Sequence, residues 1–165
     1  MDNKVVHSAD VLWVCDALYS GNVQVKPHAH ITYYHMAYVK KGTCQMSVND
    51  RSYDISPGML MLAIPEDVHS RQHSEELQLW EVKFIVHSRA LSAALKEHER
   101  VFALDELQTA LLEEIIRGGY NSCEGIDINA NRAYLSALLH NICSSFFITK
   151  GPDYEDFICK RMCSP

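Results

Sequence analysis

Four histidines in the first half of the 165-residue chain are spaced so that they could share one ligand. His28 and His30 are separated by a single residue, so both imidazoles point to the same side of an extended chain. His35 follows on the next expected strand, and His69 comes after a turn that begins at Pro65. Four neutral imidazoles that converge inside a barrel could chelate a divalent ion, with metal–nitrogen distances of about 2.0–2.1 Å for zinc. The alternative is that they are ordinary hydrogen-bond partners at the mouth of the barrel.

The residue types narrow the kind of metal site that the sequence predicts. An all-imidazole set suits Zn, Ni, Cu or Fe better than Mg or Ca, because the latter ions prefer oxygen ligands. Glu66 and Asp67, next to the last histidine, are expected to be solvated turn residues rather than general bases. The six cysteines form no CxxC pair, which argues against a zinc ribbon and favours reduced thiols.

The elements that must position these histidines are short antiparallel strands. Up to about residue 88, apolar and polar residues alternate in runs separated by turn residues, as half-buried strands require. The clearest runs are residues 11–15, 32–39, 44–48, 52–55, 59–64 and 77–86. The last run places Glu81 and Lys83 opposite an apolar face that is expected to be core, namely Trp80, Val82, Phe84 and Val86. Several short strands at this spacing predict a barrel or sandwich.

After residue 88 the apolar repeat becomes helical. A first stretch includes Leu91 and Leu95, and a second is expected to begin at Asp105, with Gln108 three residues later as in a capping box. This second helix is expected to stop at Gly118-Gly119, and a third to run from about residue 129 to 149. The apolar stripe of this third helix is wider than packing against a single neighbour requires. The two long helices therefore either cover the barrel or pair with a second copy of the chain.

The histidine segment resembles the cupin signature. In that signature a glycine precedes HxH, followed by a glutamate, a second glycine and later a proline-to-histidine element. Here His28 and His30 match the HxH, Gly42 matches the closing glycine, and residues 65–69 match the later element. His35 stands where the family usually has glutamate. The resemblance implies metal-ligand roles for the HxH histidines and His69, and His35 could still act as a ligand.

A narrower resemblance covers most of the chain. The pattern Tyr34, Tyr38-Val39, Gly42, then Pro57-Gly58 and Ile64-Pro65 before the last histidine is similar to the effector-binding domain of AraC-type transcription regulators. This implies a cupin-like antiparallel β-barrel of the jelly-roll type, followed by a helical pair that dimerises. Residues 1–87 would form the sensing barrel, 88–150 the dimerisation region, and 151–165 a tail or the start of a linker. The chain ends at Pro165, where helix-turn-helix units would follow in that family, so it is either an excised sensor or works by other means.

Two functions follow from this resemblance. The first is an effector-binding and dimerisation domain, which binds a small molecule, a divalent metal or both to control attached DNA-binding units. The alternative is a stand-alone metal-dependent cupin enzyme, such as a dioxygenase or isomerase. Aromatic side chains normally line a small-ligand pocket, and core packing is the alternative role for the expected pocket residues, which are Trp13, Tyr34, Tyr38 and Trp80.

Composition limits the remaining partners. The hydrophobic fraction of 47% and charged fraction of 22% are typical of a folded globular chain. The net charge of −6 comes without a basic patch, so DNA is expected to be reached only through a domain outside this chain. Neither a secretory signal after Met1 nor a membrane-spanning apolar stretch is visible, which predicts a cytoplasmic protein.

Overall fold

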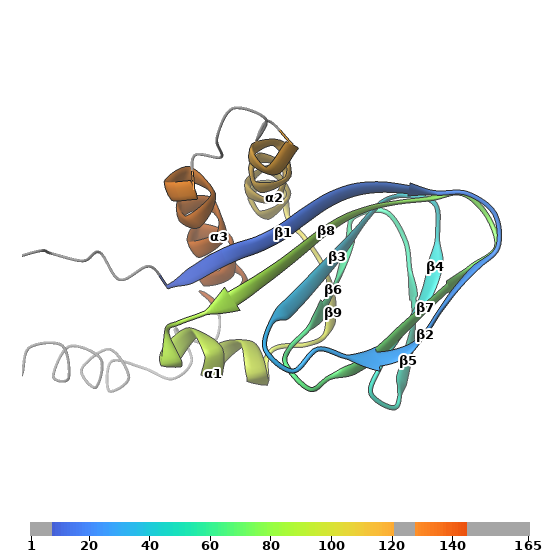
Figure 1. Ribbon diagram of the computed structural model, residues 1–165, viewed down its shortest axis with the longest axis horizontal. Coiled ribbons are helices and arrows are strands. Elements are labelled where there is room, and N and C mark those ends of the chain that lie inside the picture. Colours follow the sequence, from blue (N-terminus) through green and yellow to red (C-terminus); the bar gives the residue numbers. More distant parts are fainter. Residues whose placement is uncertain (1–7, 121–127, 145–165) are drawn as a thin grey trace, which may run out of the picture.

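The computed structural model describes residues 8–120 and 128–144, which form two antiparallel β-sheets and three helices (Figure 1). The five-stranded sheet has the order β1 (Ala9–Tyr19), β8 (Leu77–Val86), β3 (Tyr34–Lys41), β6 (Met59–Ala63) and β9 (Val101–Ala103). The four-stranded sheet has the order β2 (Val23–Ala29), β7 (Val68–His73), β4 (Cys44–Val48) and β5 (Arg51–Ile55). The cupin-like antiparallel fold expected from the sequence is confirmed.

Each of the six runs predicted as strands falls largely within an observed strand, whereas β2, β7 and β9 were not predicted. The sequence of β2 contains Pro27 and only two well-spaced apolar residues before it, so it lacks a clear alternation. The inward positions of β7 are the polar residues His69, Arg71 and His73, which an apolar pattern does not reveal. The three-residue strand β9 lies within the stretch expected to be helical and pairs with β6. The sheet therefore extends beyond the predicted boundary at residue 87.

The helices are α1 (Arg89–Glu97), α2 (Glu106–Tyr120) and α3 (Ile128–Ile142). The predicted capping box at the start of α2 is confirmed. The Asp105 carboxylate accepts from the backbone N–H of Gln108 at 2.8 Å, and the Gln108 side-chain oxygen accepts from the backbone N–H of Asp105 at 3.0 Å. The end of the predicted third helix, residues 145–149, lies outside the described residues.

The prediction that α2 stops at Gly118-Gly119 is wrong, because the helix continues to Tyr120. Both glycines allow close packing instead. A Cβ atom at Gly118 would lie 2.2 Å from the side-chain oxygen of Asn131 in α3, and one at Gly119 would lie 1.7 Å from Val14 in β1. The missing side chains thus let α2 approach both neighbours, and this close approach outweighs the cost of glycine inside a helix.

Alternation along β3 and β8 separates two apolar clusters. The first lies between the five-stranded sheet and the helices, and its sheet residues include Tyr34, Met36, Tyr38, Trp80, Val82 and Phe84. This confirms the predicted core face of β8. The second lies between the two sheets and includes Ala37, Val39, Met46, Leu77 and Leu79. The five-stranded sheet is thus covered on both faces, and Glu81, on the face towards the second sheet, is only 6% exposed.

In Figure 1 the helices and the four-stranded sheet lie on opposite sides of the long sheet, with α2 and α3 next to β1. None of the helices in the described ranges is long and apolar enough to cross a bilayer.

Candidate metal and ligand site

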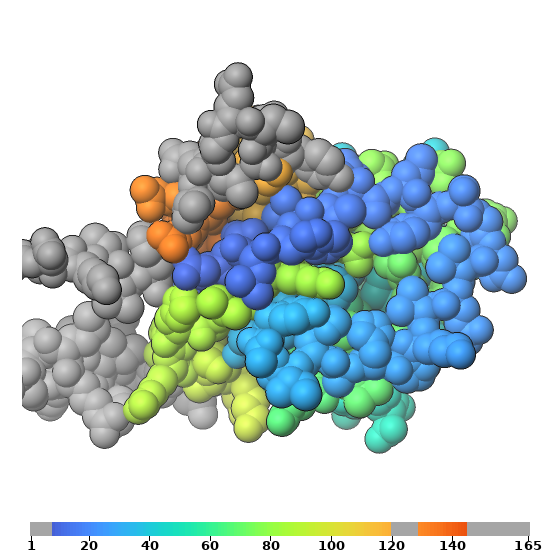
Figure 2. Space-filling model, viewed as in Figure 1, coloured from blue at the N-terminus to red at the C-terminus, as the bar shows by residue number. Residues whose placement is uncertain are grey.

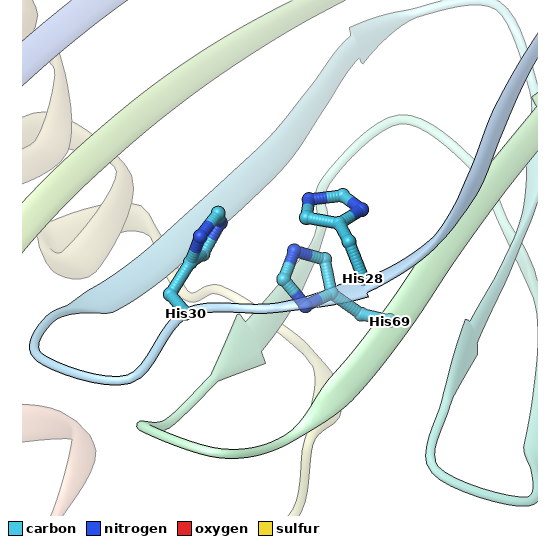
Figure 3. Close-up of side chains that lie close together, drawn as sticks. All are labelled: His28, His30 and His69. Carbon is cyan, nitrogen blue, oxygen red and sulfur yellow. The ribbon is translucent and has the colours of Figure 1, made fainter.

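Pairing of β2 with β7 brings together three of the four predicted ligands. His28 lies directly opposite His69 in the register of these strands, and His30 follows immediately after β2. The ring centroids of His28 and His69 are 4.3 Å apart, and the ring of His30 is 5.0 Å from each. One potential ligand nitrogen from each of the three lies within 4.8 Å of the other two. Figure 3 shows the three rings gathered in the same space, so one ion can reach all of them with small side-chain rotations.

The hydrogen bonds of these histidines fit a metal site. The Nδ1 atom of His28 is 2.9 Å from the carbonyl oxygen of Lys26, and that of His69 is 3.2 Å from the carbonyl of Asp67. A carbonyl only accepts, so Nδ1 carries the proton in both rings and Nε2 keeps the lone pair with which a histidine accepts a hydrogen bond or binds a metal. Ligating histidines are held by backbone carbonyls in this way. The Nε2 atom of His30 is buried without a hydrogen-bond partner in the described part of the chain.

His35 lies beside this group but is turned towards another partner. Its ring centroid is 5.6 Å from that of His30 and 5.5 Å from that of His69. The Nδ1 atom lies 3.5 Å from Nε2 of His69, whereas Nε2 lies 3.3 Å from the Glu81 carboxylate. All four predicted histidines therefore meet, but the metal-compatible group consists of His28, His30 and His69.

Glu81 lies at the centre of a buried polar network. Its carboxylate accepts a hydrogen bond from the Tyr19 hydroxyl at 2.8 Å and lies 3.7 Å from the guanidinium of Arg71, which itself covers the Tyr19 ring. Burial alone would raise the pKa of Glu81, but the contacts with His35 and Tyr19 and the charge of Arg71 outweigh it. The net effect is a pKa below the ordinary value, so this carboxylate is charged at neutral pH.

Burial has the opposite consequence for the histidines. Burial and then the positive charge that His69, His35 and His28 would carry lower the pKa of His30 to about 4. Burial also lowers the pKa of His69 to about 4, although the Asp67 carbonyl favours the protonated ring. Both imidazoles are therefore neutral at pH 7, as a metal ligand must be.

These shifts predict acid sensitivity of the metal-free protein. In an unfolded chain, histidine titrates near pH 6.5, so between about pH 6.5 and pH 4 the unfolded state binds more protons than the folded state. The free energy of unfolding should fall as the pH is lowered through this range, by at least about 1 kcal/mol between pH 7.5 and pH 5 from His69. Urea unfolding of chelator-treated protein at several pH values measures this. The loss should be smaller in a His69→Gln variant, and an equal loss in both proteins would contradict the assignment.

The histidines and the Glu81 network line one cavity between the sheets. Its volume is about 230 Å³, and its lining residues also include Trp13, Lys83, Val25, Ala37, Met46, Met61 and Ser70. Figure 2 shows this face of the molecule hollowed between β1, in dark blue, and the lighter blue segment that contains β2. The site is thus partly open to small molecules.

The predicted pocket aromatics are divided between the two faces of the long sheet. Trp13 lines the cavity. Tyr34, Tyr38 and Trp80 instead lie in the cluster against the helices, where Tyr38 stacks on Trp80 and the Tyr34 hydroxyl hydrogen-bonds Ser92. These three residues form no part of the cavity that the histidines line.

Comparison with known families decides the assignment. The family model of the AraC-like ligand-binding domain matches residues 17–145. The chain belongs to this family. The resemblance inferred from the tyrosine, glycine and proline pattern is thereby confirmed.

Solved structures similar to this AraC-like domain include cupin proteins, at low sequence identity. KdgF from Halomonas sp. is 17% identical with a TM-score of 0.39, covering 50% of this chain and 81% of that one. YhaK from Escherichia coli is 12% identical with a TM-score of 0.49, covering 64% and 47%. A cupin-2 domain containing protein from Shewanella frigidimarina is 17% identical with a TM-score of 0.37, covering 42% and 66%. Comparison with curated proteins finds no significant match.

The structure of this AraC-like domain corrects the prediction for the turn before His69. Asp67, expected to be solvated, is 8% exposed. Its carboxylate accepts hydrogen bonds from Asn49, from the backbone of Ile64 and from Arg100. Glu66, by contrast, is exposed, as expected. The sequence around Asp67 does not predict its burial, because its partner Arg100 lies thirty-three residues later.

Sequence reasoning also missed Tyr19, Arg71, Glu81 and Lys83 as cavity residues. A signal existed for two of them. Glu81 and Lys83 alternate with the core residues of β8 and therefore share the face that His35 presents from the neighbouring strand β3. No signal pointed to Arg71, because β7 itself was not recognised.

Proposed function

We propose that this chain is the effector-binding domain of an AraC-type transcription regulator, with a divalent transition metal held by His28, His30 and His69 beside the effector cavity. The observation that carries the proposal is the group of three imidazoles whose potential ligand nitrogens gather at one open cavity. Zn, Ni, Cu and Fe are the ions that suit this ligand set.

The chain's own residues would bind and orient the effector. His28, His30 and His69 would hold the ion, which would supply Lewis-acid chemistry towards an oxygen of the effector. The backbone carbonyls at Lys26 and Asp67 hold two of the rings in place, and the apolar walls between the sheets exclude water. His35 and Glu81 would present a proton donor and acceptor to the effector from the other side.

The helices are the route by which binding would reach other parts of a regulator. Helices α2 and α3 pack on β1, whose residue Trp13 lines the cavity. An effector can shift the arrangement of these elements only as far as it binds one arrangement more tightly than the other. Dimerisation through the helices and control of DNA-binding units outside this chain are part of the proposal.

The proposal is tested by the metal content of the full chain. After exposure to Zn²⁺, Ni²⁺, Cu²⁺ or Fe²⁺ and removal of excess ion, native protein should retain about one ion per chain, by the one-site geometry above. A His28→Ala/His69→Ala variant should retain almost none by elemental analysis. The matched control is His98→Ala/His140→Ala, which removes two histidines outside the cavity and should bind like native protein. Equal metal content in the native and His28/His69 proteins would end the proposal of a metal centre.

A second candidate function, a metal-dependent cupin enzyme, is favoured by one observation. Glu81 and His35 are in contact beside the three imidazoles, as an acid/base pair would be. In this case a small substrate would be turned over by metal-loaded protein, and turnover would be lost in both His30→Ala and Glu81→Gln. Binding of that molecule without any turnover would favour the sensor.

A further inference from the structure

The cavity carries an excess of positive charge although the chain as a whole has a net charge of −6. Among the described residues that line it, Glu81 is acidic, whereas Arg71 and Lys83 are basic. Glu81 already has Tyr19, His35 and Arg71 as partners. One lysine charge therefore remains uncompensated inside the cavity, before any metal ion adds to it.

Lys83 has no acidic partner among the described residues. Its ammonium group lies 4.9 Å from the ring centroid of Trp13 and 5.5 Å from that of Tyr33. These aromatic faces hold the cation without neutralising its charge. The lysine is thus fixed at the cavity and still able to bind an anion.

Arg71 also has unused hydrogen-bonding capacity. Its side chain is 10% exposed, and its Nε–H is buried without a partner in the described ranges. The 3.7 Å between its guanidinium and Glu81 is longer than a hydrogen bond. A buried N–H without an acceptor is unfavourable, so an acceptor on a ligand would be favourable here.

The size and walls of the cavity restrict what the anion can be. A volume of about 230 Å³ is below the roughly 300–1,000 Å³ typical of sites for drug-sized ligands. Val25, Ala37, Met46 and Met61 supply apolar wall beside the polar groups. One carboxylate group would balance the surplus charge that Lys83 adds to the side chains of the cavity.

From these observations we infer that the effector is a small organic carboxylate, whose oxygens bind Lys83 and Arg71 and whose short apolar part contacts the methionines. This inference rests on the proposed function, because it names the ligand class of the same cavity. The planar guanidinium can donate to the oxygens of a carboxylate.

The test compares carboxylates with their uncharged amides on metal-loaded full chain. The probes are pyruvate and benzoate, against pyruvamide and benzamide, titrated by calorimetry. We expect at least one carboxylate to bind about tenfold or more tightly than its amide, because hydrogen bonds to charged groups are the stronger ones. Lys83→Gln should weaken that carboxylate by about tenfold while leaving amide binding unchanged.

Further variants keep the test decisive. Lys83→Arg should restore most of the affinity, and Lys96→Gln, an exposed lysine on α1 outside the cavity, should bind like native protein. Arg71→Lys keeps a charge beside Glu81 but removes the Nε–H, and should weaken the carboxylate as well. The inference is overturned if native protein binds the amides as tightly as the carboxylates. It is also overturned if neither carboxylate binds with a dissociation constant below about 10 mM, which is already weak for an effector site.

The two proposals fail in different ways. If metal is retained and uncharged ligands bind as well as carboxylates, the sensor stands and only the ligand class is wrong. If the native chain and the His28→Ala/His69→Ala variant hold equal metal, the metal centre is wrong, and the carboxylate comparison can still be made on metal-free protein through Lys83.

Discussion

Replacing Asp67 by alanine is expected to lower the free energy of unfolding by about 3 kcal/mol, because it leaves a largely buried arginine charge without its partner. Arg100 donates to Asp67 at 2.6 Å and, from the same guanidinium, to the carbonyls of Leu95, Lys96 and His98 at the end of α1. The carboxylate also accepts from Asn49 and the backbone of Ile64, each at 3.1 Å. These bonds would be lost together, and urea denaturation measures the difference.

The same substitution should weaken metal binding by about tenfold, since groups that orient a ligating histidine typically matter to that extent. The Asp67 carbonyl holds the His69 ring, and the backbone N–H of neighbouring Glu66 donates to the carbonyl of His30. The turn that carries Asp67 therefore ties both ligands to α1.

A surface ion pair provides the matched control for Asp67→Ala. Glu76 contacts Lys41 at 2.7 Å, but both side chains are exposed. Glu76→Ala should cost at most about 1 kcal/mol and leave metal affinity unchanged. If both alanine variants are destabilised equally, burial does not make the Asp67–Arg100 pair contribute more to stability than the exposed pair.

The Gly42→Ala variant should be destabilised by about 3 kcal/mol or more. Gly42 connects β3 to β4 with a φ of +82°, which costs an L-residue roughly 1–2 kcal/mol. In addition, an alanine Cβ would lie 2.2 Å from the backbone oxygen of Glu76, which cannot rotate away. Thermal and urea unfolding would report the loss.

Gly58 separates the two contributions to this effect. Its φ is +94°, but a Cβ atom there would have no neighbour within 4 Å. Gly58→Ala should therefore show only the conformational cost, about 1–2 kcal/mol. Equal effects at Gly42 and Gly58 would mean that the contact with Glu76 contributes nothing.

Local patterns predicted much of the fold. Strands β4 and β8 coincide with predicted runs because each alternates clearly along its length. The capping box at Asp105 was predictable because both partners lie within four residues. Alternation also separates Tyr34 from the histidines, since Tyr34 and His35 are adjacent on one strand and must point to opposite faces.

Predictions failed where a residue's partner is distant in sequence. Gly118 and Gly119 predict a helix end from the local sequence, but their close neighbours are Asn131 and Val14. The local sequence predicts that Asp67 is solvated, because its partner Arg100 comes after α1 and is distant in sequence. Strand β7 was missed because its inward residues are polar, and they can be buried only because other elements supply their hydrogen bonds and charges.

By itself, the sequence determined the alternation of the strands, the spacing of His28 and His30 and the family pattern, all of which depend on neighbours in the chain. The pairing of His28 with His69, the burial of Glu81 and the excess charge around Lys83 were decided only by the tertiary structure. The physical reason is that burial and charge balance depend on which other element covers a residue. Here the second sheet turns the polar face of β8 into the floor of a cavity.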